Sequence, residues 1–212
     1  MCISLILESG LMAQLSLYYQ TQLETKVSLL PEQIDGDIDD HILENLRAKI
    51  EKKTIEHGIV IRIIRLIDYN QGMIDKANFM GTTVFKTKYE CLLCSPIKDL
   101  EMTCIVDNTV RGYLICRNGP VIAAIYIPTI DTHTFKVVDS KIKNISTGKE
   151  VGKGDHLKVS VISISTNLRE KNIVAMCKFL NVLTSKSDIK KFNEEQELIQ
   201  NVGITEDVDD FF

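Results

Sequence analysis

Five short segments rich in β-branched residues follow one another in the second half of the chain, separated by turn signals. The turn signals include residues 118–120 (NGP) and 152–155 (GKGD), and the connection between the third and fourth segments is longer than the others. Short strands spaced by turns, with no helical period, are typical of a small closed barrel of the OB type. The predicted strands are 102–106, 112–116, 121–127, 157–165 and 173–180.

The first half of the chain combines one helical stripe with longer strand-like runs. Apolar residues between Ile38 and Ile50 are spaced by four, which places them on one face of a helix. Residues 59–67 are β-branched and almost continuous, as in a central strand that such a helix covers on one face. Further strands are predicted at 15–30 and 83–94, each followed closely by a proline.

Together these patterns predict an α+β chain, in which a helix on an antiparallel sheet precedes a C-terminal five-stranded OB-type β-barrel. The pattern changes near Pro96, where we place the boundary between the two units. The expected parts are a leader (1–14), an N-terminal unit (15–96), a barrel (97–185) and an acidic tail (186–212).

Charge is distributed unevenly along the chain. The 212 residues carry a formal net charge of −4. Residues 188–212 hold eight acids and two lysines, a net charge of −6, so residues 1–187 carry +2. The folded part is therefore mildly cationic, and a weak contact between the barrel and a polyanion is compatible with the acidic whole.

Composition excludes a membrane-spanning protein and leaves no need for a disulfide framework. No apolar run approaches the roughly 18 residues that a membrane-spanning helix needs, because charges interrupt every hydrophobic stretch from Lys26 onward. The six cysteines do not require a disulfide framework, since a chain with 44% hydrophobic residues can build a core without one. Free thiols in a reducing compartment are the expectation.

The predicted barrel carries cations and aromatic rings suited to single-stranded RNA. OB barrels bind single strands by combining basic side chains with stacking rings on the second and third strands and the adjoining loops. Two rings predict weak, salt-sensitive and sequence-tolerant binding, although solvated surface cations and ordinary strand aromatics explain the same residues equally well. The candidates are Arg111, Tyr113, Arg117 and Tyr126, joined by Lys158 and Lys178 if the later strands close beside them.

Other chemistries find little support. Cys91 and Cys94 have the spacing of a zinc knuckle but lie in a predicted strand, where a separation of three puts them on opposite faces. Residues 148–154 (GKEVGKG) resemble a phosphate loop, but are one residue short and lack the Ser or Thr for magnesium. The four histidines match no catalytic or metal-binding spacing. We expect no cofactor, no metal and no catalytic residues.

The order of motifs along the chain resembles a known protein family. The glycines at positions 72 and 81 and the order of the strand motifs are similar to the stalk subunit of multisubunit DNA-dependent RNA polymerases, a family that includes the seventh subunit of eukaryotic polymerase II and its archaeal counterpart. The resemblance covers about residues 15–182. The motifs are 18–19 (YY), 29–31 (LLP), 58–61 (GIVI), 85–96 (FKTKYECLLCSP), 101–106 (EMTCIV), 110–115 (VRGYLI), 119–120 (GP), 125–127 (IYI) and 154–161 (GDHLKVSV).

This resemblance implies a non-catalytic subunit. Its N-terminal unit would be a tip domain that docks to the polymerase core near the clamp, with a second stalk subunit bound along tip and barrel. Its barrel would contact nascent single-stranded RNA. The leader, the connection 129–149 and the acidic tail have no counterpart in the family pattern. For docking we favour the loops at Asn70, Gln71, Gly72, Asn78 and Gly81, because exposed loops between rigid strands can enter a cleft.

The sequence leaves alternatives open for the source of the protein, for its compartment and for its function. The Ile, Lys and Asn bias suits a large DNA virus, which would place the protein in the virion and host cytoplasm; a cellular subunit would be nuclear. The tail 204–212 joins acids to two terminal phenylalanines, and is either a solvated end or a segment that docks on a basic surface. The rival functions are a stand-alone OB-fold RNA-binding or translation-factor-like protein, and a structural adaptor that contacts protein only.

Overall fold

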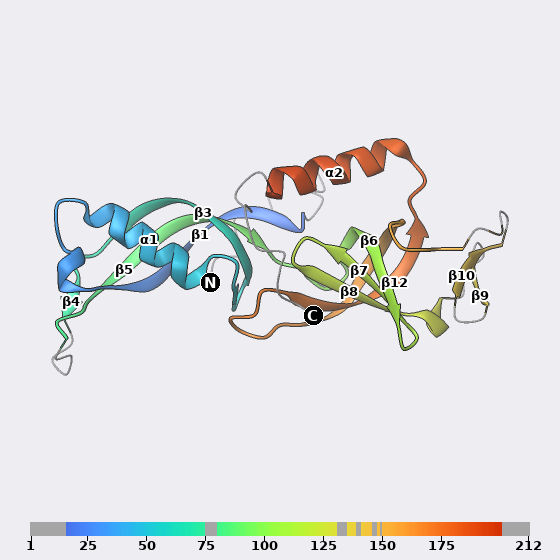
Figure 1. The fold of residues 1–212 in the computed structure, drawn as a ribbon, viewed down its shortest axis with the longest axis horizontal. Helices are drawn as coiled ribbons and strands as arrows, with labels where there is room; N and C mark the ends of the chain where they lie inside the picture. Colours follow the sequence, from blue (N-terminus) through green and yellow to red (C-terminus); the bar gives the residue numbers. More distant parts are fainter. Residues whose placement is uncertain are drawn as a thin grey trace, which may run out of the picture.

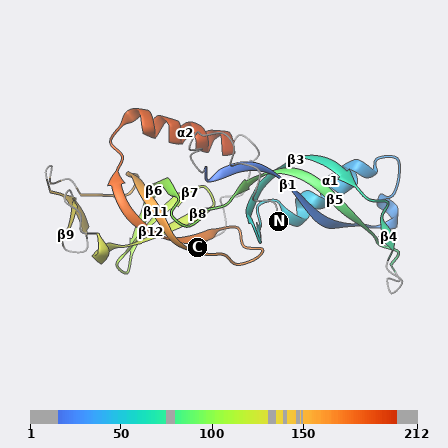
Figure 2. The ribbon, with the colours of Figure 1, turned by 180° about the vertical axis from the view of Figure 1, so that it is seen from behind.

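The computed structural model is an elongated molecule with two β-rich units placed end to end along its long axis (Figure 1). Within the described residues, no helix combines the length and apolar character needed to cross a membrane. Seen from behind, the two units keep the same end-to-end arrangement (Figure 2). The structure describes residues 16–74, 80–130, 135–138, 141–145, 148 and 150–200.

A twisted antiparallel sheet forms the N-terminal unit. Its strand order is β1-β5-β3-β2, and the short β4 pairs with the far end of β5. The central β5 pairs along its whole length with β1, from Tyr18 opposite Cys94 to Leu29 opposite Thr83. The strands are β1 (Tyr18–Leu29), β2 (Thr54–Ile55), β3 (Gly58–Tyr69), β4 (Met73–Ile74) and β5 (Thr83–Cys94).

Helix α1 (Ile38–Ile50) covers one face of this sheet, as its four-residue spacing predicts. Its buried residues Ile42, Leu46 and Ile50 pack on the alternate residues of β1, β3 and β5 that face the same side. The opposite face of the sheet carries charged residues, which is the usual division in an antiparallel sheet with one solvated side.

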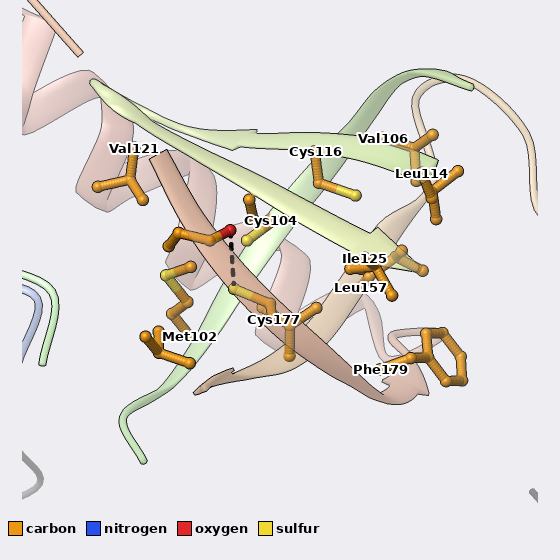
Figure 3. Close-up of a cluster of buried hydrophobic side chains, with 14 of the residues drawn as sticks. Met102, Cys104, Val106, Leu114, Cys116, Val121, Ile125, Leu157, Cys177 and Phe179 are labelled. Atoms are coloured by element: carbon orange, nitrogen blue, oxygen red, sulfur yellow. Dashed lines mark hydrogen bonds between the residues drawn. The ribbon is translucent and has the colours of Figure 1, made fainter. Parts of the chain in front are cut away.

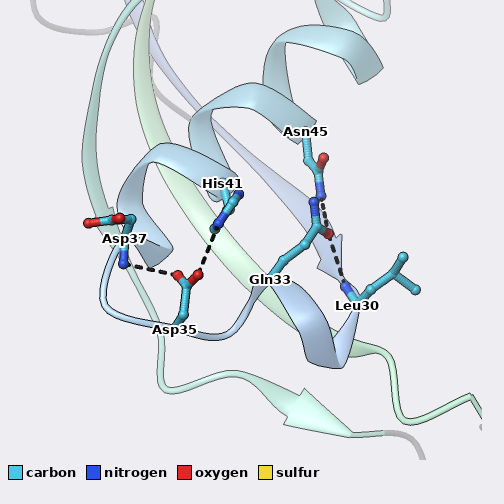
Figure 4. Close-up of polar contacts among 6 residues, drawn as sticks. All are labelled: Leu30, Gln33, Asp35, Asp37, His41 and Asn45. Atoms are coloured by element: carbon cyan, nitrogen blue, oxygen red, sulfur yellow. Dashed lines mark hydrogen bonds and ion pairs between the residues drawn. The ribbon is translucent and has the colours of Figure 1, made fainter.

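The entry to α1 is fixed by side-chain hydrogen bonds rather than by an N-cap side chain (Figure 4). A short 3₁₀ turn, η1 (Pro31–Gln33), follows β1, and Gln33 Oε1 accepts bonds from the Leu30 amide at 3.1 Å and Asn45 Nδ2 at 3.0 Å. Asp35 Oδ1 accepts the Asp37 amide at 3.0 Å, which holds the pKa of the Asp35 carboxyl below its usual value. The acidic run 35–40 therefore shapes the helix start.

A closed five-stranded barrel forms the second unit, in the order β6-β7-β8-β12-β11 and back to β6. All neighbours are antiparallel except β8 and β12, which run parallel from Ile173 opposite Val121. This is the OB arrangement that the five short segments predict, and the α+β fold class is confirmed. The strands are β6 (Glu101–Val110), β7 (Tyr113–Asn118), β8 (Val121–Tyr126), β11 (His156–Ser165) and β12 (Ile173–Val182).

Alternate residues of every barrel strand fill its interior, where aliphatic side chains surround three buried cysteines (Figure 3). Cys104, Cys116 and Cys177 all face this interior, and burial raises the pKa of the Cys116 and Cys177 thiols to about 12. A thiol with so high a pKa stays protonated near neutrality and packs as a small apolar group.

The structure contains a hairpin and a helix in the second half of the chain that the sequence patterns did not predict. The connection after β8 holds a 3₁₀ turn, η2 (Ile127–Thr129), and a hairpin of β9 (Phe135–Val138) and β10 (Lys141–Asn144). The first part of the expected acidic tail is a helix, α2 (Lys186–Gln200), which lies along the barrel. Its Phe192 and Ile199 are buried, and the Phe192 ring meets the His156 ring edge-on at 5.6 Å.

The two units share one hydrophobic core at their junction. Leu17, Ile59 and Cys94, from the N-terminal sheet, belong to the same buried cluster as the barrel interior. A side-chain hydrogen-bond centre reinforces the junction. Buried Asn118 accepts from the Tyr18 hydroxyl at 2.9 Å and from Gln196 Nε2 at 2.8 Å, so β1, the barrel and α2 meet at a single residue. The units are therefore held in one fixed arrangement.

Candidate functional site

Two tyrosines form a small aromatic surface on the outside of the barrel. Tyr113 on β7 lies directly opposite Tyr126 on β8, and the ring centroids are 5.1 Å apart with the planes tilted by 43°. Tyr126 is 41% exposed. The parallel β8–β12 ladder ends with Ile125 opposite Cys177, and the next residue on each strand, Tyr126 and Lys178, is exposed.

Arg111 lies in the turn immediately before this aromatic surface. Val110 pairs with Tyr113, which leaves Arg111 and Gly112 as a two-residue hairpin turn. Both have positive φ, 50° and 85°, as a type I′ turn requires. The first position of such a turn favours Asn, Asp or Gly, so an arginine there carries a conformational cost. We call Arg111, Tyr113, Tyr126 and Lys178 the ring surface.

Arg117 and Lys158, the other two predicted RNA-binding residues, lie elsewhere and are paired with carboxylates. Arg117 Nε is 2.9 Å from Asp107 Oδ2, on the part of β7 that lies beneath α2. Lys158 Nζ is 2.6 Å from Glu101 Oε2 on the neighbouring β6. The structure thus brings four of the six predicted residues together and gives the other two local partners.

The loop between β11 and β12 is occupied by the junction with the N-terminal unit. Thr54 on β2 donates its amide and its hydroxyl to the Glu170 carbonyl, at 2.9 and 2.7 Å. In return, the Arg169 amide donates to the Thr54 carbonyl at 2.9 Å. This loop is one of the two that OB barrels commonly use for oligonucleotides. The second of these two loops is the Arg111 turn, which lies at the far end of the barrel from the junction.

At the opposite end of the molecule the N-terminal sheet ends in exposed apolar side chains. Met73, Ile74 and Met80 are 71%, 62% and 77% exposed, and β4 holds the first two beside β5. We call these three residues the apolar tip. Exposed methionines of this kind adapt to varied apolar partners. Met73 and Ile74 follow the turn signal at 70–72 and Met80 lies within the one at 78–81, and these positions could have identified them.

The predicted docking residues frame the apolar tip. The Asn70 amide donates to the Lys86 carbonyl at 3.1 Å, and the Asn70 side-chain oxygen accepts the Lys86 amide at 2.7 Å. Gly72 has a φ of 72°, and a Cβ there would come within 2.7 Å of Phe85 and Thr83. Gln71 is exposed and Gly81 has a φ of 67°. Asn78 lies outside the described residues.

Cysteine positions in the sheet follow the strand alternation. Cys91 packs under α1, whereas Cys94 belongs to the core shared with the barrel, so the two thiols point to opposite faces. Burial raises the pKa of Cys91 to about 11 and that of Cys94 to about 12. No group of three or more His, Cys, Asp or Glu side chains within the described residues is placed to hold a metal ion.

Comparison with known proteins gives the chain its family. No established family profile matches it. It is, however, 48% identical over 200 residues to a protein of Acanthamoeba polyphaga mimivirus named "Putative DNA-directed RNA polymerase subunit L376", an alignment that covers 94% of this chain and 100% of the viral protein. The chain belongs to this family of viral DNA-directed RNA polymerase subunits. An alignment of this length includes both the N-terminal sheet and the barrel of the polymerase subunit.

Proposed function

We propose that this polymerase subunit is a stalk subunit with no active site of its own, which docks to the polymerase core through the apolar tip and contacts nascent RNA through the ring surface. The observation that carries the proposal is the placement of these two surfaces at opposite ends of one molecule with a shared core. A rigid body of this kind can attach to a large enzyme at one end and present the other end to its product.

The docking half of the proposal is supported by the chemistry of the apolar tip. Exposed Met73 and Ile74 lose contact with water when they enter an apolar pocket, which favours binding by about 1.5 to 3 kcal/mol for each side chain. The partners follow from the family resemblance: core subunits near the clamp and a second stalk subunit. The viral relative favours the virion and the host cytoplasm as the places where the subunit acts.

The RNA-binding half rests on two kinds of group. The tyrosine pair offers π faces for bases, while Arg111 and Lys178 supply charge for phosphates. Such a small surface predicts weak binding that decreases with salt and varies little with sequence. Weak binding suits a subunit that holds RNA only while the assembled enzyme is making it.

We expect the two groups of predicted RNA-binding residues to behave differently. Arg111→Ala with Tyr126→Ala should weaken binding of a labelled oligouridylate about 10- to 100-fold, because stacking contributes ~1 to 3 kcal/mol per base. Arg117→Ala with Lys158→Ala should change it less than about threefold, since Asp107 and Glu101 already offset these charges. Fluorescence anisotropy measures both. A larger loss in the second variant would remove the ring surface from the proposal.

The alternative function is a stand-alone OB-fold RNA-binding or translation-factor-like protein, for which the ring surface alone would suffice. The two functions differ in what they need from the N-terminal unit. A stalk subunit purified through a tag from cells that make the viral polymerase should bring the large polymerase subunits with it. Recovery of the chain without those subunits, together with tight RNA binding, would favour the alternative.

A further inference from the structure

The hairpin of β9 and β10 is fixed to the end of the barrel by its inward face. Phe135 is buried and its ring meets Phe179 of β12 edge-on, with centroids 5.1 Å apart. Ile142 is also buried in the barrel core, and its carbonyl accepts the Val151 amide at 2.9 Å. A two-stranded hairpin is only marginally stable alone, so these contacts with the barrel hold it in place.

The other face of the hairpin places two positive charges side by side. Lys136 on β9 lies directly opposite Lys143 on β10. Like charges at directly opposite positions destabilise a strand pair. Glu150 Oε1 lies 3.0 Å from Lys143 Nζ and offsets one of the two charges. Within the described residues no carboxylate pairs with Lys136, which is exposed.

The hairpin lies at the end of the barrel away from the N-terminal sheet (Figure 1). It follows η2, which begins at the residue after Tyr126 of the ring surface. Its anchor, Phe179, stands next to Lys178 on β12. A strand that stacks its bases on Tyr113 and Tyr126 can therefore continue toward the hairpin without crossing the junction with the N-terminal unit.

We propose that Lys136 and Lys143 bind the phosphates of the single-stranded RNA whose bases stack on the ring surface. The inference rests on the proposed function and extends its RNA site to the hairpin. A polyanion relieves the repulsion between the two lysines and releases its own counterions when it binds them. Glu150 holds Lys143 in the absence of RNA, so Lys136 is the main phosphate contact and Lys143 contributes only when the phosphate displaces Glu150.

The test is the salt dependence of oligouridylate binding to the full chain, measured by fluorescence anisotropy. Lys136→Gln with Lys143→Gln should weaken binding. The negative slope of log K against log salt should become shallower by roughly 0.7 to 1.4, the value for one or two phosphate contacts on a single strand. Glu150→Gln should act in the opposite direction, strengthening binding and steepening the slope. Lys88→Gln with Lys98→Gln, two exposed lysines outside the barrel strands, is the control with the same change in net charge.

The outcomes separate the inference from the function beneath it. If the hairpin variant titrates like the Lys88 and Lys98 control while Arg111→Ala with Tyr126→Ala still weakens binding, the hairpin is not part of the RNA site and the proposed function stands. If the unaltered chain binds no oligouridylate at low salt, both are overturned. Thermal unfolding of each variant, followed by circular dichroism, checks that the barrel remains folded.

Discussion

Replacing Gly58 with alanine should lower the free energy of unfolding by about 3 to 5 kcal/mol, a large part of the 5 to 15 kcal/mol typical of a folded domain. Gly58 begins β3 with a φ of 138°, a region that residues with a Cβ essentially do not adopt. An added Cβ would also overlap the Cys94 carbonyl oxygen and come within 3.1 Å of the Ser95 Cβ. The strain would fall where the N-terminal sheet meets the barrel.

Urea unfolding, followed by circular dichroism, measures this effect, and the chain offers a matched control. Gly36 has an ordinary φ, and a Cβ there would have no heavy atom within 4 Å. Gly36→Ala should therefore leave the unfolding midpoint unchanged or raise it slightly by restricting the unfolded chain. Equal midpoints for the two variants would mean that the backbone at Gly58 can relax, and that the close approach of β3 and β5 is not needed for folding.

Local sequence patterns were sufficient to predict most elements of the fold. The four-residue spacing from Ile38 to Ile50 identifies α1, because burial of one helical stripe decides that segment by itself. The five barrel strands appear at the expected places, although β6 and β12 run further than their apolar cores suggest. Strand ends are set by ladder hydrogen bonds to neighbours, which a single segment does not encode.

The composition of α2 explains why the sequence did not predict this helix. Its inward positions Ile189, Phe192, Gln196 and Ile199 follow a helical spacing, but charged residues surround them and the segment resembles a solvated tail. What stabilises the helix is tertiary: the Phe192 ring on His156 and the Gln196 bond to Asn118, from residues that are distant in sequence. Short helices in water depend on such packing more than on intrinsic propensity.

The candidate RNA site could be predicted only in part, for the same reason. Residue type identifies Arg117 and Lys158 as cations on strands, and no local feature distinguishes them from Arg111. The register of the barrel strands distinguishes them, because it brings Asp107 beside Arg117 and Glu101 beside Lys158. Closure of the barrel likewise brings β12, which carries Lys178, beside β8, which ends at Tyr126, through a parallel pairing between strands that are far apart in sequence. The sequence therefore shows which residues carry charge, but not which of those charges are paired with a carboxylate on a neighbouring strand.

Changing Met73 and Ile74 together to aspartate should abolish association with the polymerase while leaving the subunit folded and able to bind RNA. Two side chains that enter an apolar pocket contribute about 3 to 6 kcal/mol, so affinity should fall at least 100-fold even before the cost of burying two carboxylates is counted. Both side chains are exposed in the free subunit, so its own stability should change little.

The measurement is recovery of the large polymerase subunits with the tagged chain, quantified against the unaltered protein. Ile162→Asp with Leu168→Asp is the control, since these side chains are 52% and 64% exposed and lie away from the apolar tip, Ile162 on β11 and Leu168 in the loop that follows it. It adds the same charge at comparable exposure, so a general effect of acidity would reduce recovery with both variants. Full recovery with the Met73 and Ile74 variant would place the polymerase contact elsewhere on the subunit. Loss with that variant alone, with RNA binding retained, would assign the two ends of the molecule separate tasks.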